Sequence, residues 1–402
     1  MLVPKLRFKR EDGTSYPEWS KDKWSNLGSF VGSGTLSKSD LAEEGTPCIL
    51  YGELYTKYGE IAHTIYSKTS ATSHTFSQAD DVILPKSGET PEDISTATCI
   101  PYDGISLGGD LIVFRHNEKV TGAYLSYLIS NRAKNAIASI AQGKSVVHIN
   151  EKALSNIELP YPQIEEQQKI ADFLSAVDEV IAQSEAEVQN LEQQKKAAMQ
   201  KIFSQEVRFK REDGSEYPEW EEIAFSELYK QVNEKNDGSF GTDKIISVAN
   251  MYFKQDATVG KEDYLKSYNI CRLGDIAFEG NKSKRFAFGR LVENDIGDGI
   301  VSHVFIVFRP ISKQHNISFW KIMINYEPIM GRILAKCTKK STMMTDLVPT
   351  DFLKQTIIVP CDEEQQKIAD FLSAYDEAIR YAKQELEHWK QLKKGLLQQM
   401  FV

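Results

Sequence analysis

The chain has 402 residues, of which 41% are hydrophobic and 26% are charged, and its formal net charge at pH 7 is −9. This composition is that of an ordinary globular protein with room for two domains, and it excludes a fibrous, low-complexity or strongly basic protein. No apolar run reaches the ~18 residues that span a bilayer, and the N-terminus lacks a signal-peptide pattern, so we expect a cytoplasmic protein. Five scattered cysteines without a Cys-x-x-Cys pair favour a reducing compartment and argue against a disulfide framework or a zinc site.

The segment Arg7–Trp19 occurs twice in the chain. It returns 201 residues later as Arg208–Trp220, with eleven of its thirteen residues identical. The alternation around Phe8 and the Asp12-Gly13 turn predict a short hairpin in each copy. Stacked solenoid units recur about every 20–50 residues, so this longer spacing indicates a duplicated half-protein. We call these two copies the lead segments.

The tract from residue 20 to 162 has a mixed pattern of strands and helices. Strand-like runs at 81–84 and 111–115 precede a helical stretch at 122–141. A basic, hydroxyl-rich loop then leads to a last strand at 157–159. This order predicts an α+β domain.

Residues 163–203 carry the strongest periodicity in the chain. Apolar residues recur at alternating steps of four and three, the a/d pattern of a coiled coil. Pro162 precedes this stretch and glutamates fill its first turn, as helix N-termini favour. Residues 165–179 return at 363–377 with one change, which predicts a second helix of the same kind. The predicted seam positions are Ile170, Leu174, Val177, Ile181, Val188 and Leu191 in the first helix and Ile368, Leu372, Tyr375, Ile379, Leu386 and Trp389 in the second.

The tract from residue 221 to 360 shares almost no identity with the first tract but repeats its order of elements. Strand-like runs at 275–278 and 305–309 lie 194 residues after their counterparts. A helical stretch at 318–336 and a last strand at 356–359 follow. We therefore expect one α+β fold that carries two different sets of surface residues.

Each predicted helix of about 40 residues would be ~60 Å long. One interpretation places each helix on the surface of its own domain. The length of the seam favours another, in which the helices pair as an antiparallel coiled coil. The polar seam residues Ser184, Lys195 and Lys393 would then fix the register at some cost in stability. The predicted domains are residues 1–162 and 206–360, and the predicted spacer helices are residues 163–205 and 361–402.

Motifs of catalysis and cofactor binding are missing from the sequence. It contains no glycine-rich phosphate loop, no Asn/Asp-Pro-Pro-aromatic motif, no His-Glu-x-x-His and no Gly-x-Ser-x-Gly. His63 and His74 lack a cysteine or carboxylate partner at metal-ligand spacing, so they are better interpreted as ordinary loop or core histidines. We expect a chain that catalyses nothing on its own and binds no metal.

The organisation resembles the specificity subunit of type I restriction–modification enzymes along essentially the whole chain. The lead segments carry this resemblance, together with the passages Pro160–Leu174 and Pro360–Leu372 that open the two helices. One Glu-Glu-Gln motif alone would be weak. Two copies, each after a variable tract and before a heptad helix, are a specific pattern.

The resemblance implies an α+β protein of two similar target-recognition domains, joined by an antiparallel pair of long helices in a pseudo-twofold internal repeat. Each domain would read one half of a bipartite, asymmetric site in double-stranded DNA. The chain would bind two methyltransferase subunits and, through the complex, restriction subunits. S-adenosylmethionine for adenine N6 methylation, ATP and Mg²⁺ would belong to those partners, so this chain would bind no cofactor. The family's pseudo-circular closure would have to use Met1–Leu6, since the second helix runs to Val402.

The resemblance leaves open which side chains contact DNA. Basic and hydroxyl side chains in the loops are the candidates, because lysine and arginine bind phosphates while donors and acceptors read base edges. Solvated surface charge is the other interpretation of each of them. The candidates are Lys57, Tyr58, Lys144, Ser145 and His148 in the first tract and Lys282, Lys284, Arg285, Arg290, Lys336, Lys339, Lys340, Ser341 and Thr342 in the second.

The negative net charge and the acidic helices keep an alternative function open. The chain could be a non-catalytic coiled-coil scaffold for protein interactions, without DNA specificity. A third hypothesis, a methyltransferase fused to a specificity protein, is disfavoured because the catalytic motifs are missing.

Overall fold

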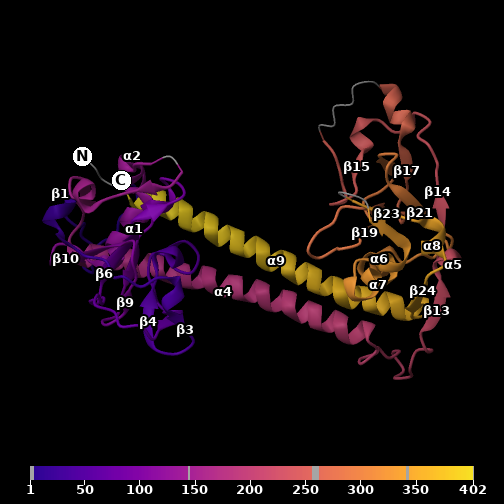
Figure 1. The fold of residues 1–402 in the computed structure, drawn as a ribbon, viewed down its shortest axis with the longest axis horizontal. Coiled ribbons are helices and arrows are strands. Elements are labelled where there is room, and N and C mark those ends of the chain that lie inside the picture. Colours follow the sequence, from indigo (N-terminus) through magenta and orange to yellow (C-terminus); the bar gives the residue numbers. More distant parts are fainter. Residues whose placement is uncertain (1–3, 144, 256–261, 341–343, 402) are drawn as a thin grey trace. The chain divides into compact units, whose positions relative to one another are not determined.

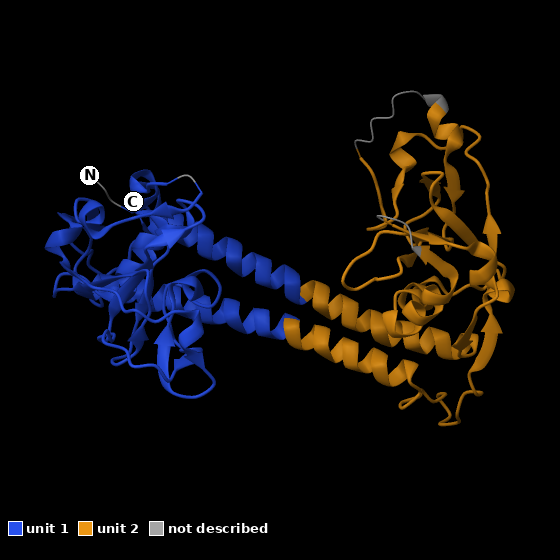
Figure 2. Ribbon diagram, viewed as in Figure 1, with its two compact units in different colours: residues 1–188, 382–402 blue, residues 189–381 orange. Residues whose placement is uncertain are grey.

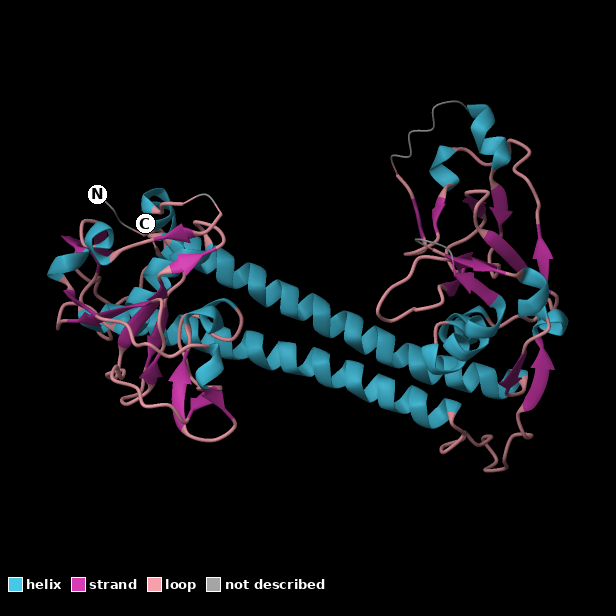
Figure 3. Cartoon of the chain, viewed as in Figure 1, coloured by secondary structure: helices cyan, strands magenta, loops and turns pink. Residues whose placement is uncertain are grey.

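A computed structural model of the chain, drawn in Figure 1, divides into two compact units, which Figure 2 distinguishes by colour. Unit 1 comprises residues 1–188 and 382–402, and unit 2 comprises residues 189–381. Helices and strands are mixed in both units (Figure 3), as the α+β class predicts. The described residues are 4–143, 145–255, 262–340 and 344–401.

The centre of unit 1 is an antiparallel sheet of four strands. In spatial order they are β2 (Gly28–Val31), β10 (Leu111–His116), β6 (Asp81–Pro85) and β8 (Thr98–Ile100). A second sheet has the order β3 (Leu41–Ala42), β5 (Ser67–Thr69), β4 (Thr46–Ile49) and β9 (Ser106–Leu107). The remaining strand pairs are β1 (Ser20–Lys23) with β12 (Glu158–Tyr161) and β7 (Ser87–Gly88) with β11 (Val147–His148). The helices are α1 (Gly122–Asn131), α2 (Lys134–Ile140) and α3 (Glu151–Leu154), with 3₁₀ turns at Trp24–Asn26, Lys38–Asp40, Tyr51–Tyr55 and Asp93–Ser95.

Unit 2 repeats this central sheet. Its strands are, in spatial order, β14 (Tyr229–Val232), β21 (Ile306–Pro310), β18 (Ile276–Glu279) and β19 (Arg290–Glu293). The strand pairs are β13 (Glu221–Ala224) with β24 (Thr356–Val359), β15 (Ile246–Ser247) with β16 (Tyr252–Phe253), β17 (Asn269–Cys271) with β20 (Gly299–Val301) and β22 (Thr338–Lys340) with β23 (Thr345–Leu347). The helices are α5 (Phe225–Leu228), α6 (Ile317–Ile324), α7 (Glu327–Cys337) and α8 (Pro349–Leu353), with 3₁₀ turns at Thr242–Lys244 and Glu262–Ser267.

The strands expected at 81–84, 111–115, 157–159 and 356–359 are confirmed to within a residue or two. Those expected at 275–278 and 305–309 each begin one residue later than predicted. Each predicted helical stretch is two helices instead of one. At the end of the first helix of each pair, the side-chain amides of Asn131 and Asn325 each donate to a backbone carbonyl four residues earlier, 2.8 Å away.

One buried ion pair recurs in the two central sheets. Arg115 Nε lies 3.1 Å from Asp81 Oδ1, and Arg309 Nη2 lies 2.9 Å from Asp275 Oδ2. Both aspartate side chains are almost fully buried. Asp81 begins β6 and Asp275 directly precedes β18, and each arginine lies on the antiparallel neighbour of that strand. The two pairs are separated by the same 194 residues that separate the predicted strands, so the units share one strand register.

The two long helices are α4 (Ile164–Phe203) and α9 (Asp362–Met400). Each follows a proline and has glutamates in its first turn, where the helix dipole favours negative charge. Every predicted seam side chain is buried or half-buried, whereas the flanking positions are mostly exposed. Gly395 does not interrupt α9. None of the described helices is long and apolar enough to cross a membrane.

Within each unit the two helices run antiparallel. In unit 1, Lys390 lies 2.6 Å from Glu185 and Lys393 lies 2.6 Å from Asp178, so residue numbers rise along one helix as they fall along the other. In unit 2, Lys195 pairs with Asp376. The antiparallel coiled coil is thus confirmed, and single-domain surface helices are excluded because each unit contains a stretch of both helices.

Each lead segment forms the predicted hairpin and is fastened to the start of a long helix. A backbone bridge joins Lys9 to Ser15 around the turn. Arg7 makes two hydrogen bonds to Glu166, at 3.0 and 2.7 Å, and the Glu166 side chain is fully buried. Phe8 packs edge-on against Phe173 at 5.7 Å between ring centroids.

The second lead segment makes the same contacts in unit 2. Arg208 bonds to the buried Glu364 at 2.9 Å, and Phe209 packs against Phe371 at 5.5 Å. A two-bond arginine–carboxylate pair fixes orientation as well as distance. The identical residues of the two copies therefore build one structural frame twice.

The frame in unit 1 joins segments from near the two ends of the sequence. Leu6 donates its backbone N–H to Gln399 at 3.0 Å. The corresponding bond in unit 2, from Val207 to Lys201 at 3.2 Å, lies within a continuous stretch of chain. Of the predicted closing segment Met1–Leu6, residues 1–3 lie outside the described residues.

Candidate nucleic-acid interface

In unit 2, the loop that follows β18 lies against the β22–β23 hairpin. Thr345 donates its backbone N–H and its hydroxyl to the carbonyl of Gly280, at 2.8 and 3.0 Å. The backbones of Asn281 and Met344 form an isolated antiparallel β-bridge. Gly280 permits this approach, because a Cβ there would lie 2.2 Å from the Thr345 carbonyl oxygen. Two candidate stretches that are far apart in the sequence therefore meet at one end of the central sheet.

A buried carboxylate orients the side chains of this loop. Glu279 is 7% exposed and accepts hydrogen bonds from Arg290 Nε at 2.7 Å and from Asn281 Nδ2 at 3.1 Å. The guanidinium groups of Arg285 and Arg290 each lie 5.0 Å from the ring centroid of Phe286. Such cation–π contacts restrict the guanidinium without neutralising it. Arg290 is thereby held in place, while Arg285 remains exposed.

The other candidates of unit 2 surround this point or fall outside the described residues. Lys282 and Lys284 are exposed on the loop after β18, Lys336 is exposed on the last turn of α7, and Lys339 is exposed on β22. The backbone of Lys340 pairs with Thr345, but its side chain is not described. Ser341 and Thr342 lie outside the described residues.

Unit 1 has the same arrangement with different side chains. The segment after β6 pairs with the late loop through β7 and β11, and Ser87 Oγ lies 3.0 Å from His148 Nδ1. Two backbone hydrogen bonds between Gln142 and His148 close the late loop on itself. His148 and Ser145 are exposed, and Lys144 lies outside the described residues.

Lys57 and Tyr58 make internal contacts in unit 1. Lys57 Nζ lies 2.7 Å from the buried carboxylate of Glu53, although the lysine side chain is 41% exposed. Tyr58 is 9% exposed and its hydroxyl accepts a hydrogen bond from the Tyr66 backbone at 3.1 Å. Burial raises the pKa of Tyr58 to about 12. The tyrosine ring is therefore a core side chain, and its role as a DNA contact stays a prediction.

Sequence reasoning missed several residues at these sites. Ser87 and Asn281 lie the same 194 residues apart as the central strands, and both follow the strand that enters the site. Tyr55 donates its hydroxyl to the Ser87 carbonyl at 2.6 Å, which places the loop of Lys57 beside β7. The fixed offset could have identified Ser87 and Asn281, whereas no sequence signal identifies Tyr55.

Metal and thiol chemistry find little support at these sites. Within the described parts of the chain, no group of three or more histidine, cysteine, aspartate or glutamate side chains could hold a metal ion. All five cysteines are free, and four are buried. Burial raises the pKa of Cys48 and of Cys337 to about 11, which leaves their thiols protonated at neutral pH.

The sequence matches one protein-family model twice. The type I restriction modification DNA specificity domain matches residues 18–193 and residues 219–390. The type I restriction enzyme MjaVIII specificity subunit of Methanocaldococcus jannaschii is 25% identical over 303 residues, covering 70% of this chain and 69% of that protein. The putative MjaX specificity subunit of the same organism is 26% identical over 317 residues, covering 72% and 70%.

Solved structures share the fold over nearly the whole chain. The S subunit of a type I restriction-modification system from M. genitalium aligns with a TM-score of 0.60 at 15% identity, covering 100% of this chain and 99% of that one. A chain from a study of complex assembly and conformational transition in the type I R-M system aligns with a TM-score of 0.54 at 15% identity, covering 96% and 98%. The chain belongs to the family of type I restriction–modification specificity subunits, and it carries two copies of the family's DNA specificity domain.

Proposed function

We propose that this chain is the DNA-recognition subunit of a type I restriction–modification complex, in which each unit reads one half of a bipartite, asymmetric site. One contrast carries the proposal. The lead segments and helix starts are nearly identical in the two copies, whereas the tracts between them differ and present different loops at the same end of the same sheet. A protein that reads two different half-sites with one fold needs this combination.

The residues at the two loop sites suit this division of labour. In unit 2, Lys284, Arg285 and Lys339 are exposed cations that can bind phosphate, and Asn281 offers an amide. In unit 1, Ser87 and His148 offer a hydroxyl and an imidazole. Because donors and acceptors at base edges carry specificity, different side chains at equivalent positions select different bases.

The methyltransferase partners are inferred from the exposed residues of the repeated frame. Its exposed residues, and not only its buried ones, are the same in both copies. Gln168 donates to Asp172 at 2.8 Å, and Gln366 donates to Asp370 at 2.7 Å on the exposed face of the second helix. Folding accounts for identical buried residues but does not constrain exposed ones, so we propose that each copy docks one methyltransferase subunit.

In this proposal the chain itself catalyses nothing. The methyltransferase subunits bind S-adenosylmethionine and methylate adenine N6, and restriction subunits use ATP and Mg²⁺. No cofactor binds this chain.

The function is tested by sequencing methylated adenines across the genome of the native host. We expect one bipartite motif, which disappears when the gene for this chain is deleted and returns when it is restored. The methyltransferase gene stays intact throughout, which controls for loss of the enzyme. Methylation that persists unchanged after the deletion would contradict the proposal and favour the scaffold.

Docking is tested separately by native mass spectrometry of the chain co-expressed with its methyltransferase. Asp172→Arg or Asp370→Arg should each reduce the bound methyltransferase subunits from two to one, and the double variant should bind none. Glu187→Arg is a charge-matched control, exposed on α4 outside the identical run. If the double variant retains both subunits, the exposed frame is not the docking surface.

A further inference from the structure

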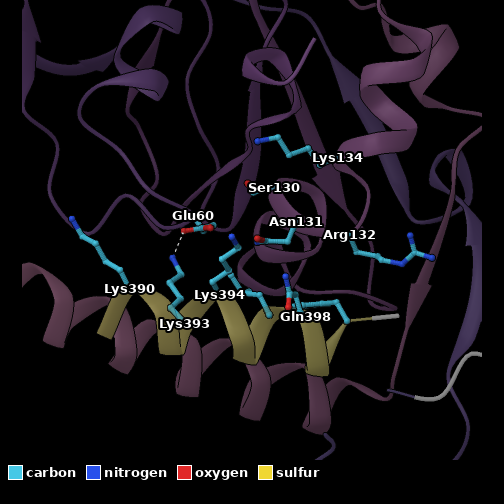
Figure 4. Close-up of a pocket in the computed structure, with 11 residues that line it drawn as sticks. Glu60, Ser130, Asn131, Arg132, Lys134, Lys390, Lys393, Lys394 and Gln398 are labelled. Atoms are coloured by element: carbon cyan, nitrogen blue, oxygen red, sulfur yellow. Dashed lines mark hydrogen bonds and ion pairs between the residues drawn. The ribbon is translucent and has the colours of Figure 1, made fainter. Parts of the chain in front are cut away.

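Unit 1 contains a cleft of about 600 Å³ between the α1–α2 connection and the last turns of α9 (Figure 4). Leu397 and Phe401 are the apolar residues of its lining. Cationic side chains from both elements line its walls, among them Arg132, Lys134, Lys390 and Lys394.

The charge of this cleft is neutralised only in part, since Lys390 pairs with Glu185 at 2.6 Å. Its one carboxylate, Glu60, lies 2.8 Å from Lys393, which also pairs with Asp178. In the part of the chain that the structure describes, no carboxylate lies within ion-pair distance of Arg132, Lys134 or Lys394. These three cations can therefore attract an anion.

The residues that line this cleft differ in part from the residues at the equivalent positions of unit 2. Phe203 is the counterpart of Phe401 at the 198-residue offset, and the ring of Tyr326, from the α6–α7 connection, packs against it at 4.7 Å between centroids. Glu192 stands at the position that Lys390 occupies in unit 1. The corresponding place in unit 2 thus carries an aromatic contact and an acidic residue. The basic lining is thus only partly repeated, since Lys196 matches Lys394, whereas Tyr326 and Glu192 stand where unit 1 has Arg132 and Lys390.

The lining points to phosphate as the ligand chemistry. An arginine guanidinium and two lysine ammonium groups bind phosphate oxygens through charge-assisted hydrogen bonds. The volume exceeds what a single phosphate fills. A free triphosphate is normally cradled by the backbone N–H groups of a glycine-rich loop, and the sequence has no such loop. Lysine and arginine side chains are among the groups by which proteins bind the phosphates of the DNA backbone.

We infer that this cleft of unit 1 binds consecutive phosphate groups of the DNA backbone, outside the base-reading loops. The inference rests on the proposed function, since the DNA must first be a ligand of the chain. It assigns the first recognition domain a sequence-independent anchor.

The test measures affinity for a specific DNA duplex by fluorescence anisotropy, using the full chain in complex with its methyltransferase, across a series of salt concentrations. The variant Arg132→Gln/Lys134→Gln/Lys394→Gln should reduce the slope of log affinity against log salt by about 2–3, at roughly 0.9 for each phosphate that the variant no longer binds. Its preferred DNA sequence should not change. The control Lys5→Gln/Lys23→Gln/Lys152→Gln removes the same charge from exposed positions of unit 1 outside the cleft and should leave the slope nearly unchanged.

The outcomes separate this inference from the proposed function. If the cleft variant keeps the wild-type slope of log affinity against log salt and still binds its specific DNA, the phosphate site is wrong and the proposed function is unaffected. Wild-type complex that binds no DNA specifically overturns the function. Adenosine triphosphate that displaces duplex at micromolar concentration from the wild type but not from the cleft variant would show a free-nucleotide site and overturn the assignment to DNA. Should the triple variant fail to fold, Arg132→Gln and Lys394→Gln alone should each lower the slope by about 0.9.

Discussion

Lys393 Nζ lies 2.6 Å from Asp178 Oδ1, and this ion pair joins the coiled-coil seam of α9 to α4 within unit 1. At the 198-residue offset the same pair recurs in unit 2 as Lys195 with Asp376, 2.5 Å apart. The surroundings differ, because Lys393 also bonds to Glu60 and its Asp178 is 28% exposed, whereas Asp376 is 57% exposed. Burial opposes the charge on Lys393, but Glu60 and Asp178 outweigh it and raise its pKa.

The two seam lysines should therefore differ in their contribution to stability. Lys393→Met leaves two partly buried carboxylates without their cation and should cost about 2–3 kcal/mol. Lys195→Met breaks a more exposed pair and should cost less than about 1 kcal/mol. Urea denaturation measures the free energy of unfolding of both variants, and hydrogen exchange shows which part of the protein is destabilised. Equal losses would mean that the surroundings of Lys393 add nothing.

A second buried pair makes the stability of unit 2 depend on pH. His315 Nε2 lies 2.6 Å from Glu293 Oε1, and the Glu293 side chain is fully buried. Burial raises the pKa of Glu293 well above its ordinary 4.5 and lowers the pKa of His315 to about 4. We therefore expect the folded pair to hold one proton near neutral pH, on the carboxyl group. In the unfolded chain above pH 6.5 the pair holds none, so stability should fall as the pH rises, by roughly 1 kcal/mol per unit.

Glu293→Gln removes this proton but keeps a hydrogen-bond donor for His315. Between pH 6.5 and 8.5 the variant should lose less stability than the wild type, as measured by urea denaturation and by hydrogen exchange in β19 and α6. Glu221→Gln, at an exposed position of β13, serves as the control and should retain the wild-type slope. A slope in Glu293→Gln equal to that of the wild type would show that Glu293 is ionised in the folded protein.

If the loop site of unit 2 binds DNA as proposed, two substitutions should distinguish phosphate contacts from base contacts. Asn281→Ala should relax the preference at one base pair of the second half-site, at about 1–3 kcal/mol of discrimination. Lys339→Ala should weaken binding to all sequences alike and lower the salt slope by about 0.9. Anisotropy titrations on single-base variants of the site distinguish the two patterns. If Asn281→Ala weakens binding to all DNA sequences equally, the amide positions the loop and reads no base.

The sequence was sufficient for the frame. The heptads of the two long helices are a local periodicity, which a sequence displays directly. The lead segments of Arg7 and Arg208 and the strands at a constant 194-residue offset are internal repeats, which a sequence also displays directly. The same offset could have placed Ser87 and Asn281 at one end of the sheets.

The loop sites could be predicted only in part. The contact of Gly280 with Thr345, and that of Ser87 with Tyr55, depend on how loops pack across the fold, which no local pattern encodes. Tyr58 illustrates the limit. Its loop has exposed neighbours and glycine, but the ring packs into a core that residues far away in the sequence complete.

The coiled coil offers a test of what sets the distance between half-sites. One heptad inserted after Val188 and another after Tyr381 would lengthen both helices by ~10 Å and keep both seams in phase. If α4 and α9 hold the recognition surfaces apart, both half-sites should be kept while the undefined spacer grows by about 3 base pairs, at ~3.4 Å each. Four-residue insertions at the same places should rotate the seams and impair assembly. An active heptad variant with an unchanged spacer would show that another element sets the distance.

The central claim is that each unit reads its own half-site. Its most direct test exchanges residues 20–160 for the corresponding tract of another specificity subunit and then sequences methylated adenines across the genome. We predict a new bipartite motif in which one half-site changes and the other is retained. A motif in which both half-sites change would contradict the account.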